Sequence, residues 1–453
     1  MRRLLQLVLF VCANLLVTLS LAQTDATQVA PPKGLNTTDA IVVDKATVGG
    51  IKIAVVPFAW QSAGLPPIAE QDIAKVVRSD FNRVGQFVAL PENAYPDLPS
   101  TLAEVNFDTW KVAQQQYIVV GRVLDNDDNT FRIEFQLARV ASGETLLSLA
   151  IQGRPGDLRS VGHQIADLIY EKIMNVRGAF WTRIAYITSQ GTGRNIKYQL
   201  RVADSDGFNP QNVVQSPEPL LSISWSPDGK QLAYVSFERG NSAIYLQDIG
   251  TGQRRLISSF RGINGAPAFS PDGSKLALTL SRSGSPEINL YDLQSNQFTQ
   301  ITRHFSIDTE PVWMPSGNEL LFTSDRSGKP QIYKIGTAGG DPVRVSFNGE
   351  YNARASVSYD GRKIAMVQGN NNVYRIAVLD RSRGEPGVTR VITDGRLDET
   401  PSFAPNASMV LYASREGTRG VLYAVAADGS VRQKLAFSEG DVREPAWGPF
   451  RQR

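Results

Sequence analysis

Side chains with catalytic potential are few in this sequence of 453 residues. It contains two histidines, His163 and His304, and neither stands near a serine and an aspartate in a pattern typical of a hydrolase. The closest approach to the G-x-S-x-G turn that exposes a nucleophilic serine is GNSAI at 240–244, which lacks the final glycine. HExxH, P-loop and GxGxxG motifs are also absent from the sequence. We therefore expect no enzymatic activity. We expect His163 to have a structural role on a helix with apolar periodicity, and His304 to lie in a loop.

Polar side chains gather instead at the start of a strand that recurs along the second half of the chain. The residues that open its copies are Asn264, Gly265 and Ala266; Asp308, Thr309 and Glu310; Asn352, Ala353 and Arg354; Asp398, Glu399 and Thr400; and Arg443 and Glu444. If the copies surround one axis, these groups converge on a single opening, which suits the docking of a protein loop or segment. The carboxylates of Asp308, Glu310 and Glu399 could also hold a cation such as Ca²⁺. The alternative is that strand starts are simply solvated.

The copies follow a constant period. Aligned on the proline of Trp225-Ser226-Pro227, they recur at 271, 315, 359, 405 and 449, with spacings of 44, 44, 44, 46 and 44 residues. In the first two copies, Pro-Asp-Gly supplies a tight turn between two apolar runs, which is typical of a β-hairpin. The second copy reads as four strands at 264–270, 275–281, 286–293 and 297–303. A period of about 44 residues with four strands per unit is the signature of a β-propeller blade.

The two ends of the array predict how many blades there are and how the ring closes. The last copy, VREPAWGPFRQR, stops after its innermost strand, and the array begins at 183–189 with a second strand that lacks a first. We therefore expect six blades over 180–453, with the N- and C-terminal strands joined in one blade. Such closure removes the open seam that an incomplete ring would leave.

A smaller α/β domain is predicted ahead of the propeller, over 45–175. A buried strand is expected at 51–58, and apolar residues at helical spacing predict a helix over 69–84. Three strands at 117–124, 131–140 and 145–153 precede a second long helix at 157–175. The chain is thus multidomain, an α/β domain followed by an all-β six-bladed propeller.

The N-terminus carries the marks of export. Arg2 and Arg3 precede an apolar run that ends in Ser20-Leu21-Ala22, so we expect a signal peptide over 1–22, cleaved after Ala22; the alternative is an uncleaved membrane anchor. The polar stretch 23–39 is expected to be a flexible tail, and the flexible N-terminal segment with its partner-binding piece spans 23–44. The apolar piece 40–44, AIVVD, could pair as an edge strand of the α/β domain or detach and add to a partner's sheet.

Composition excludes several classes of function. The one cysteine, Cys12, lies inside the apolar run, so the mature chain has no disulfide, thiolate metal site or thiol nucleophile. The chain has 47 Lys and Arg against 44 Asp and Glu; removing Arg2 and Arg3 leaves 45 against 44, a net charge of +1. No basic run stands out, so we expect no nucleic-acid partner. A bacterial periplasm suits such a cysteine-free chain.

Longer stretches resemble one family. FWTRIAYITSQ, SPEPLLSISWSPDGKQLAYVSFE, NGAPAFSPDGSKLAL, DTEPVWMP, LFTSDRSGKPQIYK and LDETPSFAPNASMVLY are similar to the TolB family, periplasmic propeller components of the Tol-Pal system of Gram-negative bacteria. The resemblance covers about 40–453. Single WSPDG copies are unspecific, whereas the ordered set together with the N-terminal domain is highly specific.

The resemblance implies a non-enzymatic scaffold, expected to be a monomer that contacts membranes only through its partners. TolB-like proteins bind the peptidoglycan-associated lipoprotein Pal at the propeller mouth and TolA through the mature N-terminal segment; they maintain outer-membrane integrity, draw that membrane inward during division and are exploited by colicins. Carried over, the Pal-binding residues are Asn264, Gly265, Thr309, Glu310, Asp398, Glu399 and Glu444. The TolA-binding residues are Ile41, Val42, Val43 and Asp44.

The chain departs from the family in two places. Relatives often carry a histidine where this sequence has Ile263, which removes one polar contact expected at the mouth, and the 23–39 tail is longer than expected. The resemblance also suggests that Pal binding changes whether 40–44 is docked or free. The remaining alternative function is a propeller that assists a hydrolase or binds a sugar or a cation.

Overall fold

The computed structural model describes residues 49–64, 66–126, 128–435 and 440–452. The predicted cleavage site after Ala22, the tail 23–39 and the TolA-binding residues 41–44 lie outside the described residues. Within the described ranges, no helix is long and apolar enough to cross a membrane.

The N-terminal α/β region is built on one mixed sheet with the strand order β3-β1-β4-β5-β6, and β2 pairs with β4 beside this path. Strand β1 pairs in parallel with β3 and β4, whereas β4, β5 and β6 are antiparallel. The strands are β1 (Ile51–Val55), β2 (Ala59–Trp60), β3 (Phe87–Ala89), β4 (Tyr117–Asp125), β5 (Phe131–Arg139) and β6 (Glu144–Gly153). The predicted strands agree with β1, β4, β5 and β6 to within three residues at each end; β2 and β3 are too short to give a periodic pattern.

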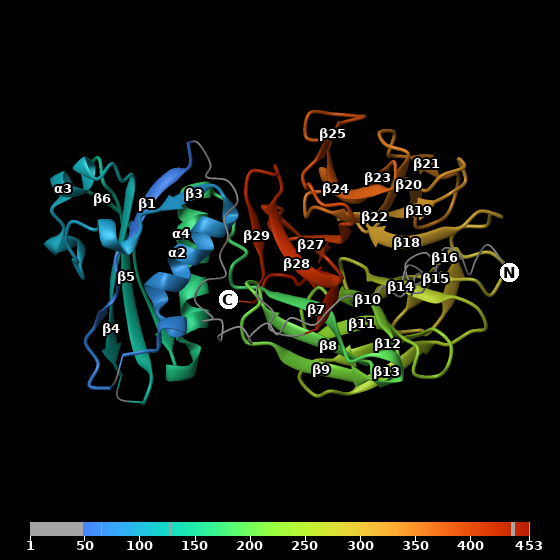
Figure 1. The fold of residues 1–453 in the computed structure, drawn as a ribbon, viewed down its shortest axis with the longest axis horizontal. Helices are drawn as coiled ribbons and strands as arrows, with labels where there is room; N and C mark the ends of the chain where they lie inside the picture. Colours follow the sequence, from blue (N-terminus) through green and yellow to red (C-terminus); the bar gives the residue numbers. More distant parts are fainter. Residues whose placement is uncertain (1–48, 65, 127, 436–439, 453) are drawn as a thin grey trace, which may run out of the picture. The chain divides into compact units, whose positions relative to one another are not determined.

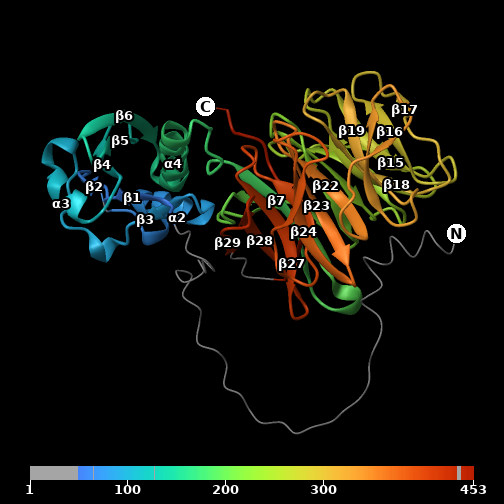
Figure 2. The ribbon, with the colours of Figure 1, turned by 90° about the horizontal axis from the view of Figure 1, so that it is seen from above.

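Two long helices cover one face of this sheet and a short one lies at the other (Figures 1 and 2). They are α2 (Ile73–Val84) and α4 (Leu158–Met174), with α3 (Phe107–Val112) on the far side. Helix α2 starts where the Asp72 carboxylate accepts the Lys75 N–H at 2.8 Å, and it ends at Gly85, whose φ of 77° is open to glycine. Phe81 and Ile165 pack with the sheet in one core, and Trp110 of α3 packs in a second.

A buried charged cluster connects α2 and α4 with the turn after strand β8 (Lys197–Asp204). His163 Nδ1 lies 2.7 Å from an Asp80 carboxylate oxygen, and its Nε2 lies 3.5 Å from Asp206. Arg159 also pairs with Asp206, while Arg83 pairs with Asp80 at 2.9 Å. His163 is therefore structural, as its place on the apolar face of a predicted helix indicates.

The cluster predicts a pH dependence of stability. Burial alone lowers the pKa of His163, but the Asp80 and Asp206 carboxylates outweigh it and raise that pKa, with Arg83 opposing them. A raised folded pKa stabilises the fold fully below the unfolded value of about 6.5, and this contribution is lost as pH rises through the folded pKa. We expect the free energy of unfolding, measured by urea denaturation, to fall as pH rises from about 6.5 through the folded pKa of His163. The variant His163→Gln is expected to make this pH dependence less steep. A variant that keeps the wild-type slope would contradict this assignment.

The rest of the chain forms six four-stranded sheets, each read here from its innermost strand outward. The first three are β10 (Leu220–Trp225), β11 (Gln231–Ser236), β12 (Ala243–Asp248) and β13 (Arg254–Ser258); β14 (Asn264–Phe269), β15 (Lys275–Leu280), β16 (Glu287–Asp292) and β17 (Phe298–Gln300); and β18 (Asp308–Trp313), β19 (Glu319–Ser324), β20 (Gln331–Gly336) and β21 (Val343–Arg344). The next two are β22 (Tyr351–Val357), β23 (Lys363–Asn370), β24 (Val373–Asp380) and β25 (Val388–Val391); and β26 (Glu399–Phe403), β27 (Met409–Glu416), β28 (Arg419–Ala426) and β29 (Arg432–Lys434).

The sixth sheet combines both ends of the array. Its order is β30-β7-β8-β9, with β30 (Asp441–Trp447) innermost, followed by β7 (Arg183–Gln190), β8 and β9 (Gln211–Ser216). Trp447 pairs with Ile184 in this ladder, and its indole N–H donates to the Thr182 hydroxyl at 2.8 Å. In Figure 1 the green β7–β9 lie next to the red β27–β29 and to β10–β13. The predicted fold class, a six-bladed propeller after an α/β region, is confirmed.

In five of the six sheets a hairpin turn connects the innermost strand to the second strand. In the first blade, the Ser226 hydroxyl donates to Asp228 at 2.6 Å, and the Asp228 carboxylate accepts the Lys230 N–H at 3.0 Å. Gly229 has a φ of 68°, which a glycine adopts without strain. Ser270 and Asp272 make the same contact at 2.6 Å in the second blade. The Ser-x-Asp pattern therefore builds a turn, not a site.

Candidate functional site

One residue in each innermost strand has a left-handed backbone. These residues are Ser222 (φ 54°), Ala266 (46°), Glu310 (56°), Arg354 (53°), Thr400 (52°) and Glu444 (51°). Each lies where the pairing register with the second strand shifts, so the six form a ring of β-bulges. A non-glycine residue in this conformation costs about 1–2 kcal/mol. Strain repeated at one position in all six blades marks the ring as a candidate functional site.

The bulges turn the ring residues toward a common channel. A cavity of about 200 Å³ is lined by the six residues named above and by their neighbours on the inner strands. Because side chains of a regular strand alternate between its two faces, the bulge breaks that alternation, and three consecutive residues of each innermost strand line the channel. The channel is thus assembled from six segments that are far apart in the sequence.

Arg354 is the centre of the ion network in this channel. Its guanidinium lies 3.0 Å from Glu310 Oε1 and 2.9 Å from Glu444 Oε1, and it donates to the Thr400 hydroxyl at 2.6 Å. The second oxygen of Glu444 accepts the backbone N–H of Ser222 at 2.9 Å. Five of the six blades are therefore joined to one another by the side chain of Arg354, its partners and the Glu444–Ser222 hydrogen bond.

The charges of the channel do not cancel. Burial alone would raise the pKa of Glu444, but the adjacent Arg354 guanidinium holds that pKa below its usual range. Burial opposes the charge of Arg354 as well, and Glu444, Glu310 and Glu399 outweigh it and raise the pKa of Arg354. Two carboxylates of the channel lining, Glu310 and Glu444, thus face one guanidinium, and the lining has a negative balance that favours a partner presenting hydrogen-bond donors or a cationic group.

The residues predicted to bind Pal divide into two groups. Gly265, Thr309, Glu310 and Glu399 are partly exposed at the start of the inner strands, and Glu444 is buried in the ring. Asn264 and Asp398 are 0% and 1% exposed. The Asn264 side chain bonds the backbone of Phe260, and Asp398 accepts the hydroxyls of Thr393 and Ser414. These two side chains stabilise the loops next to the mouth. That any of the seven predicted residues binds Pal stays a prediction.

The predicted cation site is constrained by an ion pair. Asp308 is 0% exposed, and both of its oxygens accept from Arg326 Nη2, at 2.9 and 2.8 Å. Its charge is therefore already compensated, and Glu310 faces Arg354 instead. In the described part of the chain, no three His, Cys, Asp or Glu side chains are grouped so as to hold a metal ion. A Ca²⁺ site at Asp308, Glu310 and Glu399 stays a prediction that these contacts do not favour.

Four residues of these contacts, Ser222, Arg326, Arg354 and Thr400, were not among the predicted Pal-binding residues, although Arg354 and Thr400 were predicted to lie at the opening. Arg354 and Ser222 occupy the ring position, five residues before the aligned 359 and 227, so the repeat alignment contains the signal that identifies them. Arg326 lies on the turn after β19, outside the repeated strand start, and has no such signal. His304 lies in the loop between β17 and β18, as expected.

The geometry defines the class of protein: a six-bladed β-propeller with a polar channel, preceded by an α/β domain. Residues 170–451 match the family description "TolB beta propeller domain" and residues 39–146 match "TolB amino-terminal domain". The chain is 64% identical over 399 residues to the "Tol-Pal system protein TolB" of Xanthomonas campestris pv. campestris, covering 88% of this chain and 90% of that one, and equally identical to that of Xanthomonas oryzae pv. oryzae. The crystal structure of TolB from Acinetobacter baumannii superposes with a TM-score of 0.82 at 38% identity, covering 91% of this chain and all of that one. The chain therefore belongs to the TolB family, as its motifs indicate.

Proposed function

We propose that this chain is a non-enzymatic, periplasmic component of a Tol-Pal system that binds Pal at the propeller mouth. The proposal is supported by the ring of six left-handed residues, because backbone strain repeated in every blade around one channel is typical of a functional site. The negative balance around Arg354 gives the mouth a chemistry that discriminates between partners. Relatives 64% identical to this chain carry the name of that system.

The second partner contact is proposed for the segment 40–44. Its apolar residues 41–43 and Asp44 suit strand addition to TolA, in which backbone hydrogen bonds supply affinity and alternate side chains supply specificity. Through the two contacts the chain links an outer-membrane partner with an inner-membrane partner, and so supports outer-membrane integrity and invagination during division. Pal binding at the mouth is coupled to this segment and changes the proportion of chains in which the segment is free rather than docked.

A pull-down with two variants tests this proposal. The full mature chain is expected to retain Pal and TolA from a solubilised envelope extract. Deleting residues 40–44 is expected to remove TolA and leave Pal. The variant Gly265→Trp, which places a large side chain at the mouth, is expected to remove Pal and leave TolA. Capture of neither protein by the wild-type chain, or loss of both from the 40–44 deletion, would overturn the assignment of the two contacts to separate sites.

A further inference from the structure

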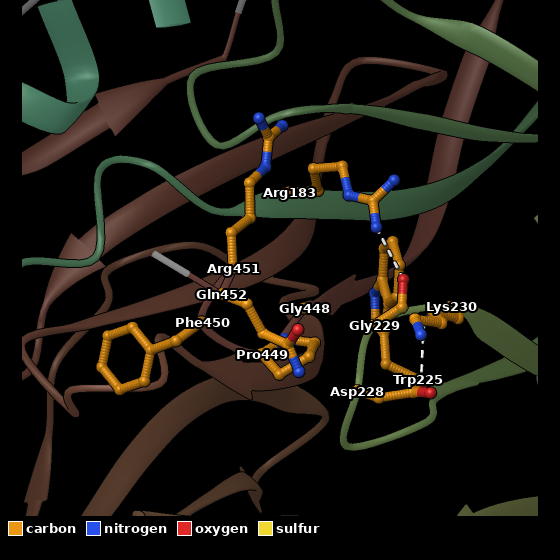
Figure 3. A pocket seen from close by; sticks show the side chains of 10 residues that line it. All are labelled: Arg183, Trp225, Asp228, Gly229, Lys230, Gly448, Pro449, Phe450, Arg451 and Gln452. Atoms are coloured by element: carbon orange, nitrogen blue, oxygen red, sulfur yellow. Dashed lines mark hydrogen bonds between the residues drawn. The ribbon is translucent and has the colours of Figure 1, made fainter. Parts of the chain in front are cut away.

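The seam of the propeller is built differently from the rest of the ring. In five sheets a hairpin turn connects the innermost strand to the second strand, but in the sixth these strands are β30 and β7, from opposite ends of the array. Residues 448–452 leave β30 where the other blades have a turn. A cavity of about 210 Å³ lies there, between the chain end, Arg183 and the turn 228–230 of the first blade (Figure 3).

Glycines permit the close approach that shapes this cavity. A Cβ on Gly448 would lie 2.9 Å from the Arg183 carbonyl oxygen and 3.2 Å from the Trp225 ring. A Cβ on Gly229 would lie 3.3 Å from Pro449. Trp225 and Pro449 therefore form apolar walls that are held next to the polar side of the cavity.

Cationic side chains collect at the seam. Arg183, Lys230 and Arg451 all line the cavity, and Figure 3 shows the guanidinium groups of Arg183 and Arg451 on the same side of it. Arg183 donates to the Gly229 carbonyl oxygen at 2.6 Å and lies over the Trp225 ring at 5.2 Å. Burial lowers the pKa of Arg183 and the nearby Arg451 lowers it further, with only Asp204 opposing them.

The neighbouring carboxylates are already engaged. Asp228 accepts the Ser226 hydroxyl and the Lys230 backbone N–H, and Asp204 pairs with Arg451 at 3.0 Å. Within the described ranges, no carboxylate lies within 4.0 Å of the Arg183 guanidinium. Arg183 is partly buried, and its guanidinium has a neutral carbonyl as hydrogen-bond acceptor, so its charge is incompletely compensated and a bound anion would correct this.

We propose that the seam cavity binds a carboxylate group, with Arg183 as the main anchor. A planar guanidinium matches a carboxylate with two parallel hydrogen bonds, and Lys230 adds a second positive charge. The apolar walls accept a short aliphatic stem. The cavity has room for a small ligand, which suits one acidic side chain or a small dicarboxylate such as glutarate.

This site is independent of the proposed Pal-binding mouth. Strand β10 contributes Ser222 to the channel ring and Trp225, three residues later, to the seam cavity, but no residue in the described part of the chain lines both cavities. Failure of one site therefore says nothing about the other, and the seam can be tested without Pal.

The test uses the indole N–H resonances of the uniformly ¹⁵N-labelled, deuterated mature chain. Sodium glutarate is titrated at constant ionic strength, balanced with sodium chloride. We expect the Trp225 resonance to shift saturably, whereas Trp313, at the same position in the third blade, stays still. Arg183→Gln is expected to weaken the binding at least about tenfold, which corresponds to losing one charge-assisted contact.

A second variant and a second ligand test the role of Lys230 and the source of the carboxylate. Lys230 is exposed, so Lys230→Gln leaves the fold unchanged and is expected to weaken glutarate up to about fivefold. A capped Ala-Glu-Ala peptide distinguishes the source of the carboxylate: equal binding identifies a protein side chain, and weaker binding a free dicarboxylate. A Trp225 resonance that does not move, that follows Trp313, or that titrates identically in the folded Arg183→Gln variant would overturn the proposal.

Discussion

A chain that lacks residues 443–453 is expected to lose the cooperative unfolding transition of the propeller. The deletion removes β30 after its second residue, and with it the buried Ala446 and Trp447, each 8% exposed. Truncating a buried aromatic residue alone costs about 3–5 kcal/mol, and a domain has only about 5–15 kcal/mol to lose. The deletion also exposes the unpaired edge of β7, which invites association with other chains. Differential scanning calorimetry and size-exclusion chromatography measure both effects.

The matched control ends the chain at Arg451. It keeps the whole of β30 and the Trp447 hydrogen bond to Thr182, and it is expected to melt as the wild type does. If the chain lacking 443–453 melted at the wild-type temperature as a monomer, the pairing of β30 with β7 would not be what closes the ring.

Replacing Arg354 by methionine is expected to cost about 3 kcal/mol of unfolding free energy. Removing one member of a buried ion network costs about 3–5 kcal/mol because the other charges are left uncompensated. The lower end applies because a quarter of the Arg354 side chain remains exposed, while Glu444 is 8% exposed. Glu310 loses its guanidinium partner in the same variant. Urea denaturation at neutral pH measures the loss.

A second substitution separates electrostatics from packing. In Arg354→Met combined with Glu444→Gln, the more deeply buried of the two uncompensated carboxylates is gone and the side-chain amide can still accept the Ser222 N–H, so part of the stability is expected to return. If Arg354→Met were as stable as the wild type, the ion network would contribute nothing to the free energy of unfolding, and backbone hydrogen bonds and packing alone would stabilise the ring. If the double variant were less stable than Arg354→Met by the full cost of Glu444→Gln, the charge explanation would be wrong.

The blade repeat and the ring could be predicted because they depend on patterns that the sequence displays directly. The spacing of the six aligned positions predicts six units, and the second strand at 183–189 without a first predicts where an inner strand is missing. The same alignment places Glu310, Arg354 and Glu444 at equivalent positions. Helices α2 and α4 were predicted to within four residues because their apolar residues recur at helical spacing.

The direction of the side chains could not be predicted in the same way. The left-handed backbone at residues such as Thr400 follows from a bulge, and no propensity favours that conformation for a β-branched residue. Sequence reasoning placed Asn264 and Asp398 at the opening, but the residue two positions before each bulge residue is buried, with Asn264, Asp308, Asn352 and Asp398 at 0–1% exposure. The Asp308–Arg326 pair joins positions 18 residues apart that only the folded blade brings together.

Gly265 gives the most direct test of the proposed mouth. A Cβ added there would meet only Ile263, at an ordinary 3.7 Å, and the backbone is not in the left-handed region, so Gly265→Trp is expected to fold normally while it obstructs the opening. Gly250, exposed in the turn between β12 and β13, is the matched control, because a Cβ there would meet only Asp248 at 3.5 Å. Isothermal titration calorimetry with soluble Pal is expected to show wild-type affinity for Gly250→Trp and at least about a hundredfold loss for Gly265→Trp, which is about 2.8 kcal/mol of binding free energy. Equal Pal affinity in both folded variants would contradict the assignment of the propeller mouth as the Pal-binding site.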